Sequence, residues 1–432
     1  MKIEPASSIR GAIAVPGVKG ISQRAVLLGA IADGESRISG FGRAADTLSA
    51  IDVVRACGVE VVDNGDDDIR VRGVGLRGLR APDGPIDCGN AGTVLRLACG
   101  ILVGQEGRFE LVGDESLTMR PHERVAAPLR EMGARIETTD GHAPVRIDGG
   151  PLHATTYRLP VASAQVKSAI LLAGLLAGDG PTTVVEPQPT RDHTERLLQS
   201  LGVRISRTPT SVSVWPVDRL PPLEVQVPGE FSSAAPLIVA AVLLAGSELV
   251  IREVNVNPTR IGLLDVLERM GARVAVFNRR SVGGEAVADL EVRSTPLVAA
   301  TVEAEEVPRL VDELPLVALL GAFAHGTTTV SGAEELRAKE TDRIDTVTTA
   351  LRAIGVRIEA RPDGFVVRGT PARPRGGRVD AATDHRIAML GAIAGLVSRE
   401  GVSIEGPECV AVSFPGFFDV LAQLVQRPDE LR

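Results

Sequence analysis

The sequence predicts an α/β protein made of six similar units, three in each of two domains. One pattern recurs six times along the 432 residues: a small or polar turn, an apolar helix, a glycine and a short β-branched strand. A second, amphipathic helix follows each of the first five copies. The apolar runs are too short to cross a bilayer, so we expect the apolar helices to be buried within a water-soluble protein.

The first helix of each unit consists almost entirely of Ala, Leu, Val and Gly. A helix that is apolar on all sides is expected to be buried, so these helices predict the centre of each domain. The six copies begin at Lys19, Gly89, Ser163, Gly229, Asp312 and Asp384 and end in strands at Ile38, Leu111, Val184, Val250, Val330 and Ile404.

The second helix of each unit has a polar face and ends in glycine. The segments VVRACG, PLREMG, RLLQSLG, VLERMG and ALRAIG place apolar residues at helical spacing before a glycine that suits a left-handed C-terminal cap. We expect these helices to lie on the outside. The sixth copy ends in a helix-like stretch from Phe417 to Leu424.

The spacing of the copies predicts the domain boundaries. Residues 1–18 and 228–432 are expected to form one discontinuous domain, and residues 19–227 the other. The longest gap lies between the fourth and fifth copies, and we expect residues 278–290, with their arginines and glycines, to be an inserted loop.

Composition excludes several classes of function. Aromatic residues make up only 3% and the net charge is −8, which argues against nucleic acid or an anionic membrane as partner. The four cysteines and six histidines have no metal-binding spacing, and no secretory signal is evident, so we expect a cytoplasmic protein without a metal. The GxGxxG match at residues 73–78 leads into a turn rather than a helix, which excludes a dinucleotide site.

Cations and amides gather where the predicted helices begin. A helix start exposes unpaired N–H groups and partial positive charge, so a cation there is unfavourable unless an anion lies between them. Helix capping explains Ser, Thr and Asp at these positions but not Lys and Arg. The pattern therefore predicts a substrate with several phosphate or carboxylate groups; the residues include Lys19, Arg24, Asn90, Arg120, Gln165, Arg191, Arg260, Lys339, Arg343 and Arg386.

Three segments carry a resemblance to a known enzyme family. PGVKGISQR (16–24), GNAGT (89–93) and RAKETDRI (337–344) resemble the signature segments of the 5-enolpyruvylshikimate-3-phosphate (EPSP) synthases. DHRIAM, VDELP and SFPGFF extend the resemblance over essentially the whole chain, while SAQVK, RDHTE and NPTR are similar to the class II subgroup. The resemblance implies a two-domain inverted α/β barrel of six βαβαββ units with the active site in the interdomain cleft.

The resemblance also implies a reaction. The 5-hydroxyl of shikimate 3-phosphate attacks C2 of phosphoenolpyruvate (PEP) while C3 is protonated, and the tetrahedral intermediate then loses phosphate. No metal, other cofactor or covalent enzyme intermediate is implied. The family further suggests a cytoplasmic monomer that acts on these two small molecules and that glyphosate, a PEP-site inhibitor, inhibits; Gly92 leaves the room that an alanine would fill.

Site residues follow from the resemblance, residue by residue. Asp312 is expected to take the hydroxyl proton, and Glu340, with Lys19, to deliver and later remove the C3 proton. PEP is expected to contact Lys19, Gly92, Arg120, Gln165, Arg343 and Arg386. Shikimate 3-phosphate is expected to contact Lys19, Gly20, Arg24, Ser163, Ala164, Gln165, Thr190, Asp312 and Lys339.

The sequence departs from the family pattern at a few of these places. Gly20 replaces the serine usually expected on the shikimate carboxylate, and we expect Ser22 or a backbone N–H to take over its role. Glu335 stands where some members have a phosphate-binding asparagine, and we expect its carboxylate to turn away. Val412 replaces a lysine that contacts PEP in some members.

Two alternative functions remain open from the sequence. A UDP-N-acetylglucosamine enolpyruvyl transferase is expected to carry a loop cysteine near residues 116–120, where this chain has none. A non-catalytic paralogue that binds an anionic metabolite would fit Gly20 and Val412, although the retained Asp312 and Glu340 argue against it.

The rarity of lysine gives a first testable prediction. Of the 47 basic residues only Lys2, Lys19, Lys167 and Lys339 are lysines, and three of them lie in the motifs above. Because the compact ammonium of lysine and the planar fork of arginine bind anions differently, we expect Lys19→Arg and Lys339→Arg both to lower activity substantially. Steady-state kinetics of both variants would measure this, and full activity in both would refute it.

Overall fold

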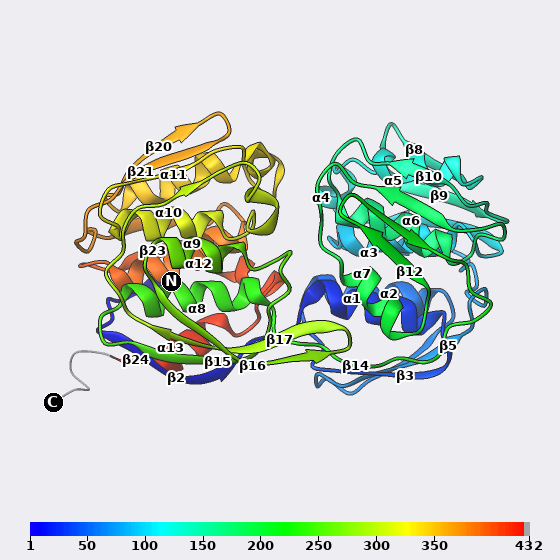
Figure 1. The fold of residues 1–432 in the computed structure, drawn as a ribbon, viewed down its shortest axis with the longest axis horizontal. Coiled ribbons are helices and arrows are strands. Elements are labelled where there is room, and N and C mark those ends of the chain that lie inside the picture. Colours follow the sequence, from blue (N-terminus) through cyan, green and yellow to red (C-terminus); the bar gives the residue numbers. More distant parts are fainter. Residues whose placement is uncertain (427–432) are drawn as a thin grey trace. The chain divides into compact units, whose positions relative to one another are not determined.

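The computed structural model describes residues 1–426 and has the predicted α/β class, with helices and small sheets distributed over two compact units (Figure 1). The first unit consists of Met1–Pro16, Gly229–Arg280 and the described part of Ala286–Arg432, and the second of Gly17–Pro228 and Ser281–Glu285. Each unit has its own hydrophobic core.

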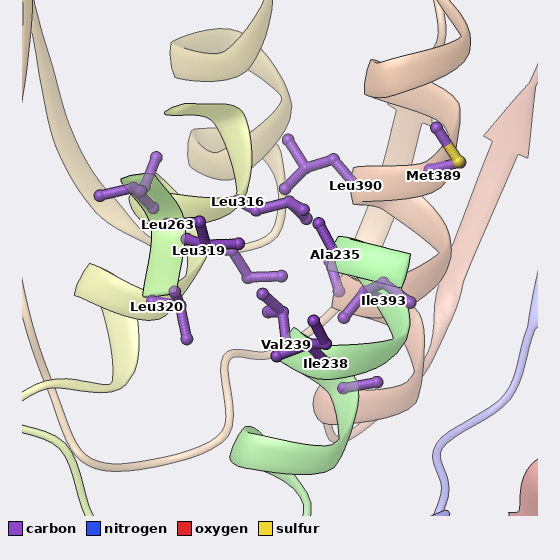
Figure 2. Packing of buried hydrophobic residues seen from close by; sticks show 14 of the residues in the cluster. Ala235, Ile238, Val239, Leu263, Leu316, Leu319, Leu320, Met389, Leu390 and Ile393 are labelled. Atoms are coloured by element: carbon purple, nitrogen blue, oxygen red, sulfur yellow. The ribbon is translucent and has the colours of Figure 1, made fainter. Parts of the chain in front are cut away.

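Buried apolar helices form the centre of each unit, as their composition predicts. In the second unit α3 packs against both α1 and α6, and in the first unit α8, α10 and α12 pack against one another. Figure 2 shows side chains of these last three helices, among them Ile238, Leu316 and Ile393, gathered in one cluster. None of the helices in residues 1–426 has the length and apolar character that crossing a membrane requires. The central helices are α1 (Lys19–Ala30), α3 (Gly92–Leu102), α6 (Ala164–Gly174), α8 (Phe231–Leu243), α10 (Leu314–Phe323) and α12 (His385–Val397).

The second helix of each unit buries one face and exposes the other, as predicted. The glycine that follows each of the first five has a positive φ, between 79° and 95°, which confirms the left-handed C-terminal cap. These helices are α2 (Ala45–Ala56), α5 (Glu123–Glu131), α7 (His193–Ser200), α9 (Gly262–Arg269), α11 (Arg343–Ala353) and α13 (Phe417–Leu424); the short helix α4 spans Glu115–Thr118.

The sheets repeat one topology. Four four-stranded sheets each combine one parallel pair with two antiparallel pairs, in the orders β14-β3-β5-β4, β6-β7-β9-β8, β10-β11-β13-β12 and β18-β19-β21-β20. The first unit also contains β1-β23-β22 and β16-β17-β15-β2-β24.

The strands of the second unit are β3 (Asp33–Ser39), β4 (Glu60–Asp63), β5 (Ile69–Val74), β6 (Ile86–Asp87), β7 (Gly107–Val112), β8 (Arg135–Thr139), β9 (His142–Gly149), β10 (Thr156–Arg158), β11 (Thr182–Val185), β12 (Ile205–Thr208), β13 (Ser211–Val214) and β14 (Glu224–Gln226). The remaining strands are β1 (Lys2–Ile3), β2 (Ser8–Ala14), β15 (Glu248–Asn255), β16 (Arg273–Val282), β17 (Glu285–Arg293), β18 (Thr301–Val302), β19 (Thr327–Val330), β20 (Arg357–Arg361), β21 (Gly364–Arg368), β22 (Gly377–Asp380), β23 (Val402–Glu405) and β24 (Val425–Gln426).

The expected loop at residues 278–290 is wrong. This segment belongs to a long β-hairpin, β16 and β17, whose turn is Gly283-Gly284. Both glycines have positive φ, 56° and 81°, which is the conformation that a two-residue hairpin turn of type I′ requires. The arginines that suggested a loop lie on the exposed part of β16, where charged side chains are compatible with a strand.

Close packing between α3 and α6 requires a glycine at position 100. A Cβ atom built on Gly100 would lie 2.2 Å from the carbonyl oxygen of Ala169, so one of the two helices would have to move. We therefore expect Gly100→Ala to lower the free energy of unfolding by about 1–3 kcal/mol. Gly178→Ala is the matched control, because a Cβ atom there meets nothing within 4 Å. Urea denaturation measures both variants, and equal stability of the two would contradict the prediction.

Candidate active site

The start of α1 places two of the predicted ligands. Lys19 is the first residue of the helix, and its ammonium donates to the carboxylate of Asp46 at 3.1 Å. Gly20 follows it, and its carbonyl oxygen accepts a hydrogen bond from Arg24 at 2.8 Å. Ser22 is buried and its hydroxyl accepts from the backbone N–H of Gly42 at 3.1 Å.

Arg24 is buried and uses each of its guanidinium nitrogens. Nε donates to the Thr194 hydroxyl at 2.7 Å and Nη2 to the Ser168 hydroxyl at 3.0 Å, in addition to the bond to Gly20. Burial lowers the pKa of Arg24 to about 10. Because these acceptors are neutral oxygens, the positive charge of Arg24 is hydrogen-bonded without being cancelled by them, which suits contact with an anion.

Gly92 and Arg120 lie together at the start of α3. A Cβ atom on Gly92 would lie 3.3 Å from Nη1 of Arg120 and 3.4 Å from Nη1 of Arg96. Arg120 donates to the side chain of Asn90 at 2.5 Å and to the hydroxyl of Ser116 at 3.2 Å. The glycine therefore lets two guanidinium groups approach a helix N-terminus closely, an arrangement that favours an anion.

Gln165 connects α6 to this group. Its amide oxygen accepts from Arg96 and its Nε2 donates to the Thr93 hydroxyl at 2.9 Å. Arg96 is buried, and its Nε has no hydrogen-bond partner within the described residues. Burial, together with the nearby Arg124 and Arg120, lowers the pKa of Arg96 to about 9. This excess of positive charge is unfavourable until an anion binds.

Ser163, Ala164 and Thr190 lie around the start of α6. Ser163 is the N-cap residue, and its hydroxyl accepts from the N–H of Val166 at 3.4 Å; Ala164 is the first residue of the helix. The Thr190 hydroxyl donates to the carboxylate of Glu186. Ser163 and Thr190, both predicted to contact shikimate 3-phosphate, therefore already use their hydroxyls in local hydrogen bonds.

Lys167 forms buried ion pairs next to this region. Its ammonium lies 3.1 Å from Glu186 and 2.8 Å from Glu195, and its side chain is only 1% exposed. The same Glu186 accepts the Thr190 hydroxyl, and the ammonium also donates to the Thr190 carbonyl oxygen at 3.5 Å, so Lys167 positions Thr190 both directly and through this carboxylate. Lys167 therefore orients the segment that carries Thr190.

Asp312 lies among three guanidinium groups of the first unit. Its carboxylate is 3.1 Å from Arg260, 3.7 Å from Arg343 and 3.7 Å from Arg386. Arg386 is also 3.7 Å from Glu313, a fully buried residue next to Asp312 whose pKa burial raises. The two predicted PEP ligands Arg343 and Arg386 are thus partly neutralised by carboxylates in this structure.

Glu340 and Arg343 form an ion pair at the start of α11. Arg343 is buried; its Nη2 lies 2.5 Å from Glu340, and its Nε lies 2.8 Å from the buried carboxylate of Asp384. Partial burial works to raise the pKa of Glu340, but the positive charges of Arg343 and Arg386 and a backbone hydrogen bond together outweigh it, so that the pKa is lowered from its ordinary value. Glu340 therefore carries a negative charge near neutral pH.

Lys339 is paired with Glu335 on the preceding turn. Its ammonium donates to the Glu335 carboxylate, which is itself 63% exposed. The expectation that Glu335 turns away is therefore wrong: attraction by the neighbouring ammonium holds the carboxylate at the predicted phosphate ligand. A phosphate that contacted Lys339, as the resemblance implies, would have to displace this carboxylate or share Lys339 with it.

Comparison with known proteins decides the family. The family model described as EPSP synthase (3-phosphoshikimate 1-carboxyvinyltransferase) matches residues 3–421. The chain belongs to the EPSP synthase family. It is 48% identical to the 3-phosphoshikimate 1-carboxyvinyltransferase of Alkalilimnicola ehrlichii, over 97% of this chain and 94% of that one. The corresponding protein of Geobacillus kaustophilus is also 48% identical, over 97% of this chain and 98% of that one.

Solved structures agree with the assignment to the EPSP synthase family. An EPSP synthase from Acinetobacter baumannii superposes with a TM-score of 0.91 at 39% identity, covering 99% of this chain and 98% of that one. The enolpyruvyl transferase NikO from Streptomyces tendae has a TM-score of 0.78 at 22% identity, which shows the fold alone. These findings confirm the predicted fold family and favour it over the two alternatives left open by the sequence.

Several residues of this EPSP synthase family member were not found from the sequence motifs. Arg96 lies one helical turn after Gly92, and the signal was a single arginine in an otherwise apolar helix. Arg260 was predicted only as one of the cations at helix starts, with no contact to Asp312, yet it makes the shortest contact of the three guanidinium groups to Asp312. Glu186, which accepts the Thr190 hydroxyl, carried no signal in the sequence.

The buried ion pairs of Lys167 lead to a stability prediction. Removing the ammonium by Lys167→Ala would leave the buried carboxylates of Glu186 and Glu195 without their cation, which we expect to cost about 3–5 kcal/mol of unfolding free energy. Lys2→Ala is the matched control, because Lys2 is 55% exposed and pairs with the exposed Glu4. We expect the control to change stability by no more than about 0.5 kcal/mol. Urea denaturation compares the two, and similar small losses would show that the Lys167 pairs contribute little.

Proposed function

We propose that this chain transfers the enolpyruvyl group of PEP to the 5-hydroxyl of shikimate 3-phosphate, giving EPSP and phosphate. The hydroxyl oxygen forms a bond to C2 of PEP and loses its proton, while C3 gains a proton and becomes a methyl group. The tetrahedral intermediate then loses phosphate as a proton leaves C3. The names of the relatives, which share nearly half of their residues with this chain, support this reaction.

One observation in the structure carries the proposal: the two groups proposed to handle protons belong to one charge network. Arg343 contacts both Glu340, at 2.5 Å, and Asp312, at 3.7 Å. Asp312 is the proposed acceptor of the hydroxyl proton, and Glu340 is the proposed donor to C3. A guanidinium shared between them is suited to bind a PEP oxygen close to both groups.

The charge of Glu340 bears on its proposed role as an acid. A carboxylate paired with Arg343 has no proton to donate. Glu340 can therefore act as an acid only if binding of PEP changes the groups around it. If the carboxylate or phosphate of PEP takes over Arg343, Glu340 loses its main cationic partner and its affinity for a proton rises. Lys19, which the family resemblance also connects with C3, is the second proposed source of this proton.

The proposed ligands for the substrate anions are those that the family resemblance implies. For PEP they are Lys19, the Gly92 backbone, Arg120, Gln165, Arg343 and Arg386, and for shikimate 3-phosphate they are Lys19, Gly20, Arg24, Ser163, Ala164, Gln165, Thr190, Asp312 and Lys339. Arg96 joins the PEP group because it bonds to Gln165 and lies next to Gly92. Guanidinium groups are well suited to phosphates and carboxylates because they donate two parallel hydrogen bonds.

Phosphate release from PEP tests the function directly. Purified protein is incubated with PEP and shikimate 3-phosphate, and turnover is expected only when both are present. PEP with UDP-N-acetylglucosamine serves as the control for the alternative acceptor. Glyphosate is expected to compete with PEP, because Gly92 carries no side chain into the space beside Arg120. Absence of turnover with shikimate 3-phosphate at high enzyme concentration would refute the proposed function.

Replacing Glu340 should separate catalysis from binding. We expect Glu340→Ala to lower kcat by about 10²–10⁴-fold, the usual worth of a general acid or base, with a smaller effect on the KM for PEP. Glu334→Ala removes an exposed glutamate of the same segment and is expected to behave like the unchanged protein. Steady-state kinetics of the two variants make the comparison. Near-normal turnover of Glu340→Ala would remove Glu340 from the catalytic group.

We further propose that the enzyme acts in the cytoplasm as a monomer. Light scattering after size-exclusion chromatography measures the oligomeric state, and a mass twice the 45.3 kDa of the chain would contradict the proposal.

A further inference from the structure

The NPTR segment holds a buried arginine that the proposed reaction has not yet used. Residues Asn257 to Arg260 form a tight turn in which the N–H of Arg260 donates to the Asn257 carbonyl oxygen at 2.8 Å. The buried Asn257 side chain also accepts from the N–H of Thr259 at 3.0 Å and from its hydroxyl at 2.9 Å. The turn therefore fixes the backbone from which Arg260 extends.

Arg260 donates to three acceptors inside the first unit. Its Nη1 lies 3.1 Å from Asp312, and its Nη2 lies 3.2 Å from Glu230 and 2.6 Å from the hydroxyl of Ser232. Ser232 in turn donates to the fully buried Glu313. Burial works to lower the pKa of Arg260, but Glu313, Asp312 and Glu230 outweigh it, so the guanidinium stays charged.

The three cations around Asp312 differ in whether they are proposed to bind PEP. Arg343 and Arg386 lie 3.7 Å from its carboxylate and are the proposed ligands of PEP. Arg260 lies closer to Asp312, at 3.1 Å, and is not among the proposed ligands of PEP; its other partners are Glu230 and Ser232. When PEP occupies Arg343 and Arg386, Arg260 is the cation that stays on Asp312.

We infer that Arg260 is the positioning residue for Asp312: it holds this carboxylate in place as the proton acceptor while PEP draws Arg343 and Arg386 away. The inference rests on the proposed function. In the step concerned, the O–H bond of the 5-hydroxyl breaks, its proton moves to an oxygen of Asp312, and the hydroxyl oxygen bonds to C2 of PEP. Arg260 itself exchanges no proton, and it acts by fixing the direction and the charge of the acceptor.

Charged groups from several elements surround Asp312. These groups are Arg260 before α9, Glu230 before α8, Glu313 at the start of α10, Glu340 and Arg343 at the start of α11, and Arg386 in α12. Removing the nearest cation raises the pKa of a carboxyl, and a base works only when deprotonated. The acid limb of kcat should therefore move to higher pH when Arg260 is replaced, by roughly one unit.

Two variants and one control test the inference. Arg260→Met removes the charge, and Arg260→Lys keeps it without the fork that reaches Asp312 and Ser232 together. We expect Arg260→Met to lower kcat by about 10- to 100-fold through loss of orientation, with the KM for PEP within about twofold and the acid limb shifted upward. Arg260→Lys should recover part of kcat and most of the profile. Arg43→Met, which removes a two-bond pair with Asp63 in the other unit, controls for the loss of an ion pair.

The outcomes separate this role from simple stability and from the function itself. A lower melting temperature with unchanged kcat and pH profile in Arg260→Met, as expected for Arg43→Met, would overturn the role of Arg260. If Arg260→Met does not fold, Arg260→Lys decides: lower kcat at a near-normal melting temperature supports the role, and unchanged kcat and profile overturn it. Absence of turnover in the unchanged protein would overturn the proposed function and this inference together, whereas normal turnover isolates the test of Arg260.

Discussion

The burial of Arg343 is the constraint on which the candidate site depends. Its side chain is only 1% exposed, and a guanidinium in such surroundings is stable only if acidic partners compensate its lost hydration. Asp384 and Glu340 provide these partners, at 2.8 and 2.5 Å. Because they come from different copies of the repeated unit, compensating one buried charge fixes segments that are far apart in the sequence, and Asp312 is held in the same network.

The second unit also buries cations, but only some of them are compensated by carboxylates. Lys167 is compensated by two buried carboxylates and is therefore structural. Arg24 and Arg96 are also buried, but the acceptors described above for both are hydroxyl, amide and carbonyl oxygens, and their pKa values fall with burial. Cations held by neutral acceptors keep their attraction for an anion, whereas cations held by carboxylates must first exchange partners. The proposed guanidinium ligands of the two units are thus of two kinds.

Much of the fold could be predicted because it depends on the periodicity of apolar residues and on glycines at the ends of helices. The apolar central helices and the glycine after each outer helix leave a local signal, and the structure confirms both. The hairpin at residues 273–293 was missed because its outer strand exposes arginines, so composition indicated a loop although Gly283 and Gly284 form a tight turn. Arg96 and Arg260 could not be placed for another reason: their partners lie far along the chain, and no spacing reveals which carboxylate or amide a lone arginine will meet.

The rarity of lysine now has a physical explanation at the site. Lys19 donates to the carboxylate of Asp46 and Lys339 to that of Glu335, each through its ammonium. An ammonium makes a point contact that an incoming phosphate can replace or share, whereas an arginine would hold the same carboxylate through two parallel bonds and release it less readily. At Lys167 the ammonium has a structural role instead. A compact ammonium fits between the two buried carboxylates, where a planar guanidinium would need more room. In a chain whose other basic residues are, apart from Lys2, all arginine, lysine therefore remains where exchange or close packing requires it.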